Sequence, residues 1–257
     1  MVILAQIKGL IALLVLLIVA IPTCLLVIPF PMKTRMKVTY PMWGFMFRVI
    51  MKYGLSARIT TAEDQRSEEL KTTPPYGLYI VNHQSYMDIP LLATMYQAPP
   101  IMKKEVLYIP FIGLLGWISG ALPVSRSSAD SRKKVFSLVR RRLKTEKCGI
   151  QVYPEGTRSK DSAPKEFSLI KKTLIVFAYN ENIPVIPTSI YGTRGIIGKN
   201  KLIKPGQHVG IIVHKEIEPK DFASADEFAK ACWEKVREGY DEMRKTIGPK
   251  NGNLSLV

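Results

Sequence analysis

The chain has 257 residues, with 37 Lys and Arg against 21 Asp and Glu, which gives a formal net charge of +16. This length allows one sizeable hydrophobic core with an appendage, and the charge indicates anionic partners such as lipid headgroups or nucleic acid. The three cysteines, Cys24, Cys148 and Cys232, are too scattered for a metal-ligand motif or a disulfide framework, which favours a reducing compartment.

The first predicted element is an apolar helix near the N-terminus. No charged residue occurs in the 24 positions from 9 to 32, a length that can cross or deeply enter a hydrocarbon layer. A cleaved signal peptide is the alternative, but the apolar run exceeds the usual length of such a segment and no small-residue cleavage motif ends it. Pro22 lies inside the run and is expected to kink or break the helix.

A second helix, basic and amphipathic, is expected directly after the first. Residues 33–58 hold six Lys or Arg and no acidic residue, and their apolar side chains recur at helical spacing. This pattern predicts an interfacial helix with Trp43 and Phe47 as membrane anchors, and the basic flank predicts that the rest of the chain lies on the cytoplasmic face of the inner leaflet. An anchor that enters one leaflet and returns is favoured over a single full span, and both stay open.

Beyond residue 75 short apolar runs alternate with helical patterns, which predicts one α/β domain with a mixed central sheet flanked by helices. The predicted division is 1–62 for the membrane-anchoring helical pair and 63–257 for the α/β domain. Strands are expected at 78–81, 100–102, 122–124, 150–153, 185–190 and 209–213. Helices are expected at 88–96, 130–147, 165–180 and 225–246.

The segment NHQSYMD, residues 82–88, follows the first predicted strand and holds one of three histidines. Asp88 is five positions after His83, so on one continuous helix the two side chains would point about 140° apart. Pro90 is tolerated only in the first turn of a helix, so the helix begins near Asp88 and leaves His83 on the preceding loop. There Asp88 can orient one ring nitrogen of His83 while the other acts as a general base. The alternative is that Asp88 only caps the helix and His83 packs in the core.

The segment YPEGTRSKD, residues 153–161, follows another predicted strand. Pro154 ends that strand, Gly156 lets the backbone approach a ligand closely, and Arg158 offers a fork of donors suited to phosphate. The pattern predicts an anion-binding turn. A hydrophilic turn with an ordinary surface arginine is the alternative.

Together, NHQSYMD and YPEGTRS resemble two sequence blocks of the glycerolipid acyltransferase family, in particular the bacterial 1-acyl-sn-glycerol-3-phosphate acyltransferases. In that family an NHxxxxD block carries the catalytic base, and a block with the pattern (F/Y)PEGTR binds the phosphate of the acceptor. The segments GALPVSR, 120–126, and NIPVIPTSIYG, 182–192, are similar to two further blocks. Ser125 and Thr173 depart from the family pattern, which commonly has Asp or Asn and glycine at these places. These departures bear on the acceptor's identity more than on the reaction type.

The resemblance implies transfer of a fatty acyl group from acyl-CoA or acyl carrier protein to the sn-2 hydroxyl of lysophosphatidic acid, giving phosphatidic acid for phospholipid synthesis. His83 and Asp88 would be the catalytic pair, and Glu155 would brace Arg158. The residues implied in phosphate binding are Arg158, Gly156, Glu155, Thr157 and Arg126. For Lys103 and Lys104 two interpretations stay open: contact with the phosphates of the donor's carrier, and a solvated strand end. Membrane lipids are expected as partners, and no cofactor, metal ion or nucleic acid is expected.

Three other functions stay open at this point. The acceptor could be another lysophospholipid, a lyso-ornithine lipid or glycerol 3-phosphate; the chain could be a thioesterase or lipase in which His83 activates water; or it could be a non-catalytic basic protein. Nucleic acid is disfavoured because much of the basic charge flanks the apolar segment, which suits lipid phosphates better. A covalent acyl-enzyme is disfavoured because the sequence has no G-x-S-x-G motif and no cysteine near His83.

Overall fold

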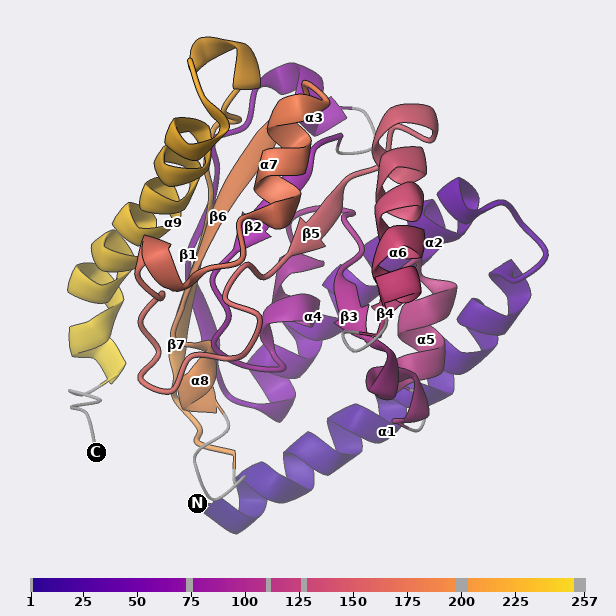
Figure 1. The fold of residues 1–257 in the computed structure, drawn as a ribbon. Coiled ribbons are helices and arrows are strands. Elements are labelled where there is room, and N and C mark those ends of the chain that lie inside the picture. The colour runs from indigo at the N-terminus through magenta and orange to yellow at the C-terminus, as the bar shows by residue number, and fades with distance from the viewer. Residues whose placement is uncertain (1, 73–75, 110–111, 126–128, 197–202, 252–257) are drawn as a thin grey trace.

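The computed structural model describes residues 2–72, 76–109, 112–125, 129–196 and 203–251. Two N-terminal helices, α1 (Val2–Val27) and α2 (Met32–Val49), lie against one side of an α/β domain (Figure 1). A wider helical turn, Ile50–Gly54, continues α2. Helix α1 runs through Pro22 to Val27, so this proline does not end it.

The central sheet is mixed, as predicted. Its strand order is β1-β7-β6-β2-β5, and only the β6–β7 pairing is antiparallel among the strands described. These strands are β1 (Arg58–Asp64), β2 (Leu78–Val81), β5 (Ile150–Val152), β6 (Val185–Tyr191) and β7 (His208–Val213). A parallel pair, β3 (Ile101–Lys103) and β4 (Leu122–Val124), adjoins β5 through a bridge between Pro100 and Gln151. The predicted strands are all present within a residue or two of their expected bounds.

Helices cover both faces of this sheet (Figure 1). They are α3 (Glu68–Thr72), α4 (Asp88–Leu92), α5 (Ile112–Ile118), α6 (Ala129–Arg140), α7 (Thr173–Asn180), α8 (Thr193–Ile196) and α9 (Ala225–Ile247). Shorter helical turns occur at Lys104–Tyr108, Arg141–Thr145, Phe167–Leu169, Pro219–Asp221 and Gly248–Asn251.

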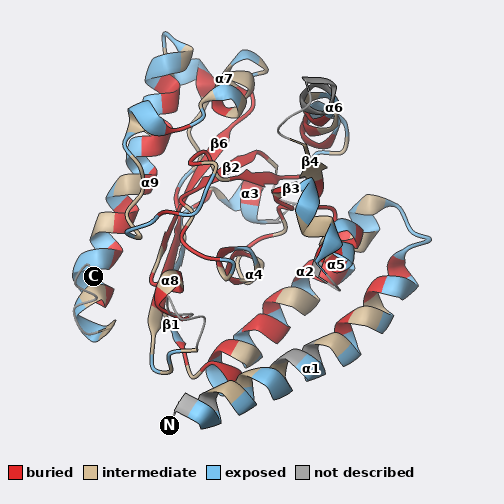
Figure 2. Ribbon diagram, turned by 60° about the horizontal axis from the view of Figure 1, so that its bottom comes forward, coloured by how far each residue is buried: buried red, intermediate tan, exposed pale blue. Residues whose placement is uncertain are grey.

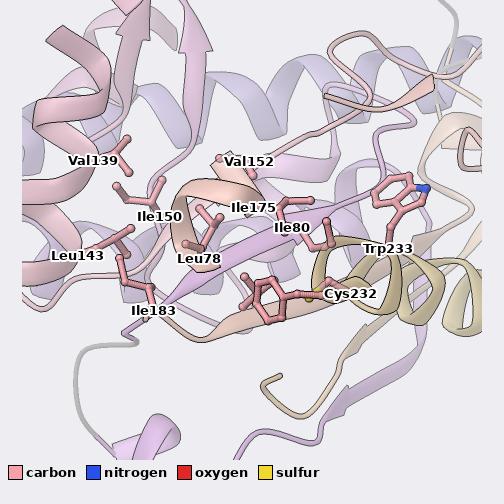
Figure 3. Close-up of a cluster of buried hydrophobic side chains, with 14 of the residues drawn as sticks. Leu78, Ile80, Val139, Leu143, Ile150, Val152, Ile175, Ile183, Cys232 and Trp233 are labelled. Carbon is pink, nitrogen blue, oxygen red and sulfur yellow. The ribbon is translucent and has the colours of Figure 1, made fainter. Parts of the chain in front are cut away.

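One face of the sheet packs against α6, α7 and α9. Leu78 and Ile80 of β2 meet Val139 of α6, Ile175 of α7 and Trp233 of α9 in this cluster, and all five side chains are fully buried (Figure 3). Burial of large apolar side chains contributes about 1.5–3 kcal/mol each, so this cluster anchors the strands that carry the site.

The other face packs against the end of α2, α4 and α8. Tyr79 and Val81, the alternate residues of β2, meet Phe47, Leu91 and Ile196 there. Both faces of β2 are therefore buried, which explains why its sequence is a continuous apolar run rather than an alternating one.

Helix α1 lies along the domain instead of projecting from it. The Gln6 side chain exchanges two hydrogen bonds with the backbone of Ile203, at 3.1 and 3.3 Å, and farther along α1 Ala12 lies against Gly54. Near its end, Cys24 packs with Leu115 of α5. The opposite side of α1 is exposed over its length (Figure 2). Residues 6–27 are long and apolar enough to cross a membrane, by length and composition.

Of the two predicted membrane anchors on α2, Phe47 lies in the core and Trp43 is only partly exposed. Phe47 is 4% exposed and belongs to the core, and Trp43 is half-buried and donates its indole N–H to Ser119 at 2.9 Å. Phe45 instead points outward, with 71% of its surface exposed. The helical spacing identified an apolar stripe correctly, but this stripe packs on the α/β domain because the domain offers its own apolar surface there.

Strand β1 is not predicted by the sequence pattern. It forms the sheet edge, and its residues are exposed or half-buried, so its sequence RITTAED holds no apolar run. The boundary expected between residues 62 and 63 falls inside this strand, whose pairing with β7 joins it to the sheet.

Candidate active site

Three loops meet at the carboxyl edge of β6, β2 and β5. His83 follows β2, Glu155 follows β5, and Thr193 follows β6. Because β2 pairs in parallel with both β5 and β6, the three strands end at the same edge of the sheet. Open α/β sheets bind ligands at such an edge. The topology therefore brings together side chains from three distant parts of the sequence.

His83 and Asp88 are in contact. The Nδ1 atom of His83 is 2.7 Å from Oδ2 of Asp88, and α4 begins at Asp88 with Pro90 in its first turn, as expected. The same oxygen accepts the backbone N–H groups of Gln84 and Ser85, at 2.7 and 2.9 Å. Asp88 is fully buried, whereas 18% of the His83 side chain stays exposed. Asp88 thus does more than cap the helix, and His83 is not enclosed in the core.

The contact with Asp88 assigns the two ring nitrogens of His83. A carboxylate oxygen accepts hydrogen bonds, so in the neutral ring Nδ1 carries the proton and Nε2 keeps a lone pair. The ring lies against Tyr153, with centroids 4.2 Å apart and planes tilted by 33°. No hydrogen-bond partner for Nε2 occurs among the described residues, so this nitrogen can accept a proton from a substrate.

The two sequence motifs are bonded to each other on both sides of His83. The backbone N–H of His83 donates to Oε1 of Glu155 at 2.8 Å, and the backbone N–H of Ser159 donates to the carbonyl of His83 at 2.7 Å. The Gln84 side chain adds a hydrogen bond to the carbonyl of Ser162 at 2.9 Å. His83 and the predicted anion-binding turn therefore border one site.

Glu155 does not occupy the predicted position beside Arg158. Its side chain turns inward and is 3% exposed, while Arg158 turns outward, because Gly156 adopts a positive φ of 70° between them. Desolvation by burial raises the pKa of Glu155 to about 7, against the lowering effect of the hydrogen bond from the His83 amide. Glu155 thus braces the His83 backbone, and the expectation that it braces Arg158 is wrong.

Positive charge surrounds the turn at Gly156. The guanidinium of Arg158 lies 4.0 Å from the centre of the exposed Tyr86 ring, and the Lys171 side chain packs against Gly156, where a Cβ would come 3.2 Å from it. On the other side, Lys165 donates to the Glu155 carbonyl at 2.9 Å and Lys165 Nζ is 3.2 Å from the Thr157 hydroxyl. These cationic side chains suit an anionic ligand, whereas the Gly156 N–H is already bonded to the Tyr153 carbonyl at 3.0 Å.

The other residues implied by the family resemblance lie in different places. Lys103 ends β3 and Lys104 begins the following turn, both exposed, with Lys103 3.9 Å from Glu105. Their ammonium groups are open to solvent, as a role toward donor phosphates requires. Arg126 lies outside the described residues.

Other reactive side chains show structural contacts. The Ser85 hydroxyl accepts the backbone N–H of Met87 at 3.1 Å, and Cys24, Cys148 and Cys232 are buried thiols. Within the described part of the chain, no group of three or more His, Cys, Asp or Glu side chains gathers to hold a metal ion.

Sequence reasoning missed several residues of this site. Thr193 donates its hydroxyl to Oδ1 of Asp88 at 2.5 Å, and Arg194 donates to the carbonyl of Ser159. Lys165 and Lys171 were expected inside a helix from residue 165, but α7 begins at Thr173 and the preceding residues run along the turn. None of these positions has a distinctive local pattern, so only the sheet topology could identify them.

Comparisons with known proteins agree with this architecture. The family model described as Acyltransferase matches residues 61–191. The 1-acyl-sn-glycerol-3-phosphate acyltransferase of Escherichia coli (strain K12) is 27% identical over 215 residues, which covers 80% of this chain and 81% of that protein. The chloroplastic 1-acyl-sn-glycerol-3-phosphate acyltransferase BAT2 of Brassica napus is 34% identical over 160 residues, covering 60% of this chain and 44% of that protein.

A solved structure shares the whole fold. The crystal structure of the 1-acyl-sn-glycerophosphate (LPA) acyltransferase PlsC from Thermotoga maritima superposes with a TM-score of 0.73, covering 95% of this chain and 96% of that one. At 23% sequence identity this likeness establishes the fold.

Proposed function

The chain belongs to the acyltransferase family, and we propose that it transfers a fatty acyl group from an acyl thioester to the sn-2 hydroxyl of lysophosphatidic acid, giving phosphatidic acid. Family membership confirms the resemblance seen in the sequence. The observation that carries the proposal is the contact of His83 with Asp88 in a loop that is itself bonded to the turn of Glu155 and Ser159. The names of the relatives, 1-acyl-sn-glycerol-3-phosphate acyltransferases, support the choice of acceptor.

His83 supplies the base that the acceptor hydroxyl needs. Nε2 takes the hydroxyl proton as the oxygen attacks the thioester carbonyl, and the C–S bond then breaks and releases the thiolate. The proton on His83 passes to that thiolate, so the base is regenerated and no net proton is gained or lost. Asp88 holds the ring and stabilises its charged form. A positioned base of this kind contributes about 10²–10⁴-fold in rate.

The cationic turn holds the acceptor so that its hydroxyl faces His83. Arg158 and Lys171 offer donors to the phosphate from one loop, and that loop is bonded to the His83 backbone. The Gly156 amide, which the resemblance implied as a further donor, is bonded to the Tyr153 carbonyl at 3.0 Å. Binding of the phosphate near the base orients the hydroxyl before it reacts. This orientation lowers the entropic part of the activation barrier. Arg126 stays a proposed contributor on the strength of the family resemblance alone.

The N-terminal helices attach the enzyme to one leaflet of the membrane. Helix α1 is apolar and exposed on its outer side, yet residues along its length, from Gln6 to Cys24, contact the α/β domain. A helix that crossed the bilayer would carry one of its ends away from a domain on the cytoplasmic side, so these contacts favour insertion into the inner leaflet parallel to the surface. Helix α5 packs against α1 and carries the exposed apolar side chains of Leu114 and Trp117, and Tyr108 shortly before it is exposed as well.

The donor is a soluble thioester, acyl-CoA or acyl carrier protein. The exposed ammonium groups of Lys103 and Lys104 support contact with the phosphates that both carriers present. A thioester is already activated, so the transfer requires no cofactor and no metal ion.

The experiment that tests this function separates transfer from hydrolysis. Purified enzyme in detergent is incubated with acyl-CoA or acyl carrier protein, with and without lysophosphatidic acid, and both free thiol and phosphatidic acid are measured. Thiol release that depends on lysophosphatidic acid supports the proposal. Equal release without acceptor would favour a thioesterase, and release only with another lysophospholipid, a lyso-ornithine lipid or glycerol 3-phosphate would change the acceptor. His83→Ala should abolish transfer and leave binding to vesicles intact.

A further inference from the structure

Asp88 receives one hydrogen bond from a residue far away in the sequence. Three donors to its carboxylate come from the His83 loop itself, and all three bind Oδ2. The fourth is the hydroxyl of Thr193, which lies 105 positions later and binds Oδ1 at 2.5 Å. Thr193 is fully buried. Both oxygens of the buried carboxylate are therefore satisfied, and only Thr193 serves the second one among the described residues.

The end of β6 holds Thr193 in this place. Gly192 has a φ of 86°, and a Cβ there would lie 2.3 Å from the carbonyl oxygen of His208, so the chain turns where only glycine fits. One position beyond Thr193, Arg194 is bonded to the carbonyl of Ser159. The hydroxyl is thus fixed from both sides rather than carried on a free loop.

The hydroxyl controls how the carboxylate is turned. A carboxylate rotates readily about its last bond, and rotation would move Oδ2 away from Nδ1 of His83. A donor at Oδ1 fixes that rotation. The hydroxyl also lies 3.2 Å from Oε1 of Gln84, but its single hydrogen goes to the charged and closer acceptor.

We infer that Thr193 is a positioning residue for acyl transfer, which through Oδ1 of Asp88 aims Oδ2 at the base His83. The inference rests on the proposed role of His83 as general base. Thr193 touches no reacting atom, and its effect passes entirely through Asp88.

The test replaces the hydroxyl with a methyl group. Thr193→Val should lower kcat about 10- to 100-fold with the KM values for donor and acceptor unchanged, since a lost hydrogen bond to a charged group has about this effect. Thr193→Ser keeps the hydroxyl and should restore most of kcat. Thr188→Val, at an equally buried threonine in the preceding strand β6, controls for the loss of a buried hydroxyl and should change kcat less than about twofold.

A double substitution distinguishes positioning from a structural role. If Thr193 acts through Asp88, adding Thr193→Val to Asp88→Asn should lower kcat no further, whereas independent structural damage would multiply the two losses. Additive losses, or a Thr193→Val enzyme with more than half of the wild-type kcat, would overturn the inference. Thiol release is followed with lysophosphatidic acid, with other acceptors and with water alone. If the wild-type enzyme acts only on water or on another acceptor, the proposed function is overturned. The kcat values of the Thr193 variants, measured with that acceptor, still test the inference about Thr193.

Discussion

Glu155→Gln is the substitution whose effect can be worked out furthest from the structure. Oε1 of Glu155 accepts the His83 amide, and Oε2 is buried with no hydrogen-bond partner among the described residues. Glutamine keeps the accepting oxygen and the shape of the side chain but cannot ionise. The substitution therefore isolates the consequence of a buried charge beside the backbone of His83.

The sign and size of the effect follow from the raised pKa. Burial raises the pKa of Glu155 from 4.5 to about 7, so the folded protein holds this proton more tightly than the unfolded chain. Its contribution to stability is fully present below about pH 4.5 and is lost as the pH rises through about 7. Each pKa unit corresponds to about 1.4 kcal/mol, so about 3 kcal/mol is lost over this window.

Urea unfolding in detergent at about pH 5 and about pH 8 measures this difference. The free energy of unfolding of Glu155→Gln, taken relative to wild type, should rise by about 2–3 kcal/mol between the two pH values. Glu166→Gln is the matched control, because the Glu166 side chain is 65% exposed. It measures how much the loss of a surface carboxylate changes the pH dependence of the free energy of unfolding. A relative stability of Glu155→Gln that does not change with pH would refute the account of Glu155 as a desolvated carboxyl.

Three further outcomes test other parts of the structure. Phe47→Ala should lower the free energy of unfolding by about 3–5 kcal/mol because it empties a core position. Phe45→Ala should leave that stability unchanged and reduce the fraction of protein that sediments with anionic vesicles. Equal effects of both substitutions would contradict the orientation of α2. Arg158→Lys should raise the acceptor KM about tenfold with little change in kcat, since a point charge replaces a planar fork, and an unchanged KM would remove Arg158 from the phosphate. Gly156→Ala forces a Cβ into a backbone with φ 70° beside Lys171 and should lower kcat/KM for the acceptor, measured in the same assay; wild-type kcat/KM would show that the turn does not approach the substrate.

Local sequence was sufficient for most of the sheet and for the contact between His83 and Asp88. The strand at 78–81 is buried on both faces, so its apolar run identified it, and Pro90 located the helix start that turns Asp88 back toward His83. Strand β1 was not predicted because an exposed edge strand needs no apolar run. Helical periodicity found the buried stripe of α2 but could not say whether lipid or protein covers it, which is why Phe47 was assigned to the wrong surface.

The sequence alone determined the chemistry available to this protein: a long apolar N-terminal helix, a histidine with its carboxylate, and a glycine–arginine turn suited to phosphate. These features are local, because proline, glycine and apolar periodicity act over a few neighbouring residues. Only the tertiary structure decided that Glu155 faces His83, that Lys171 borders Gly156, and that Thr193 completes the bonding of Asp88. Those contacts join the ends of parallel strands far apart in the chain, and strand order is set by the packing of the whole core rather than by any one segment.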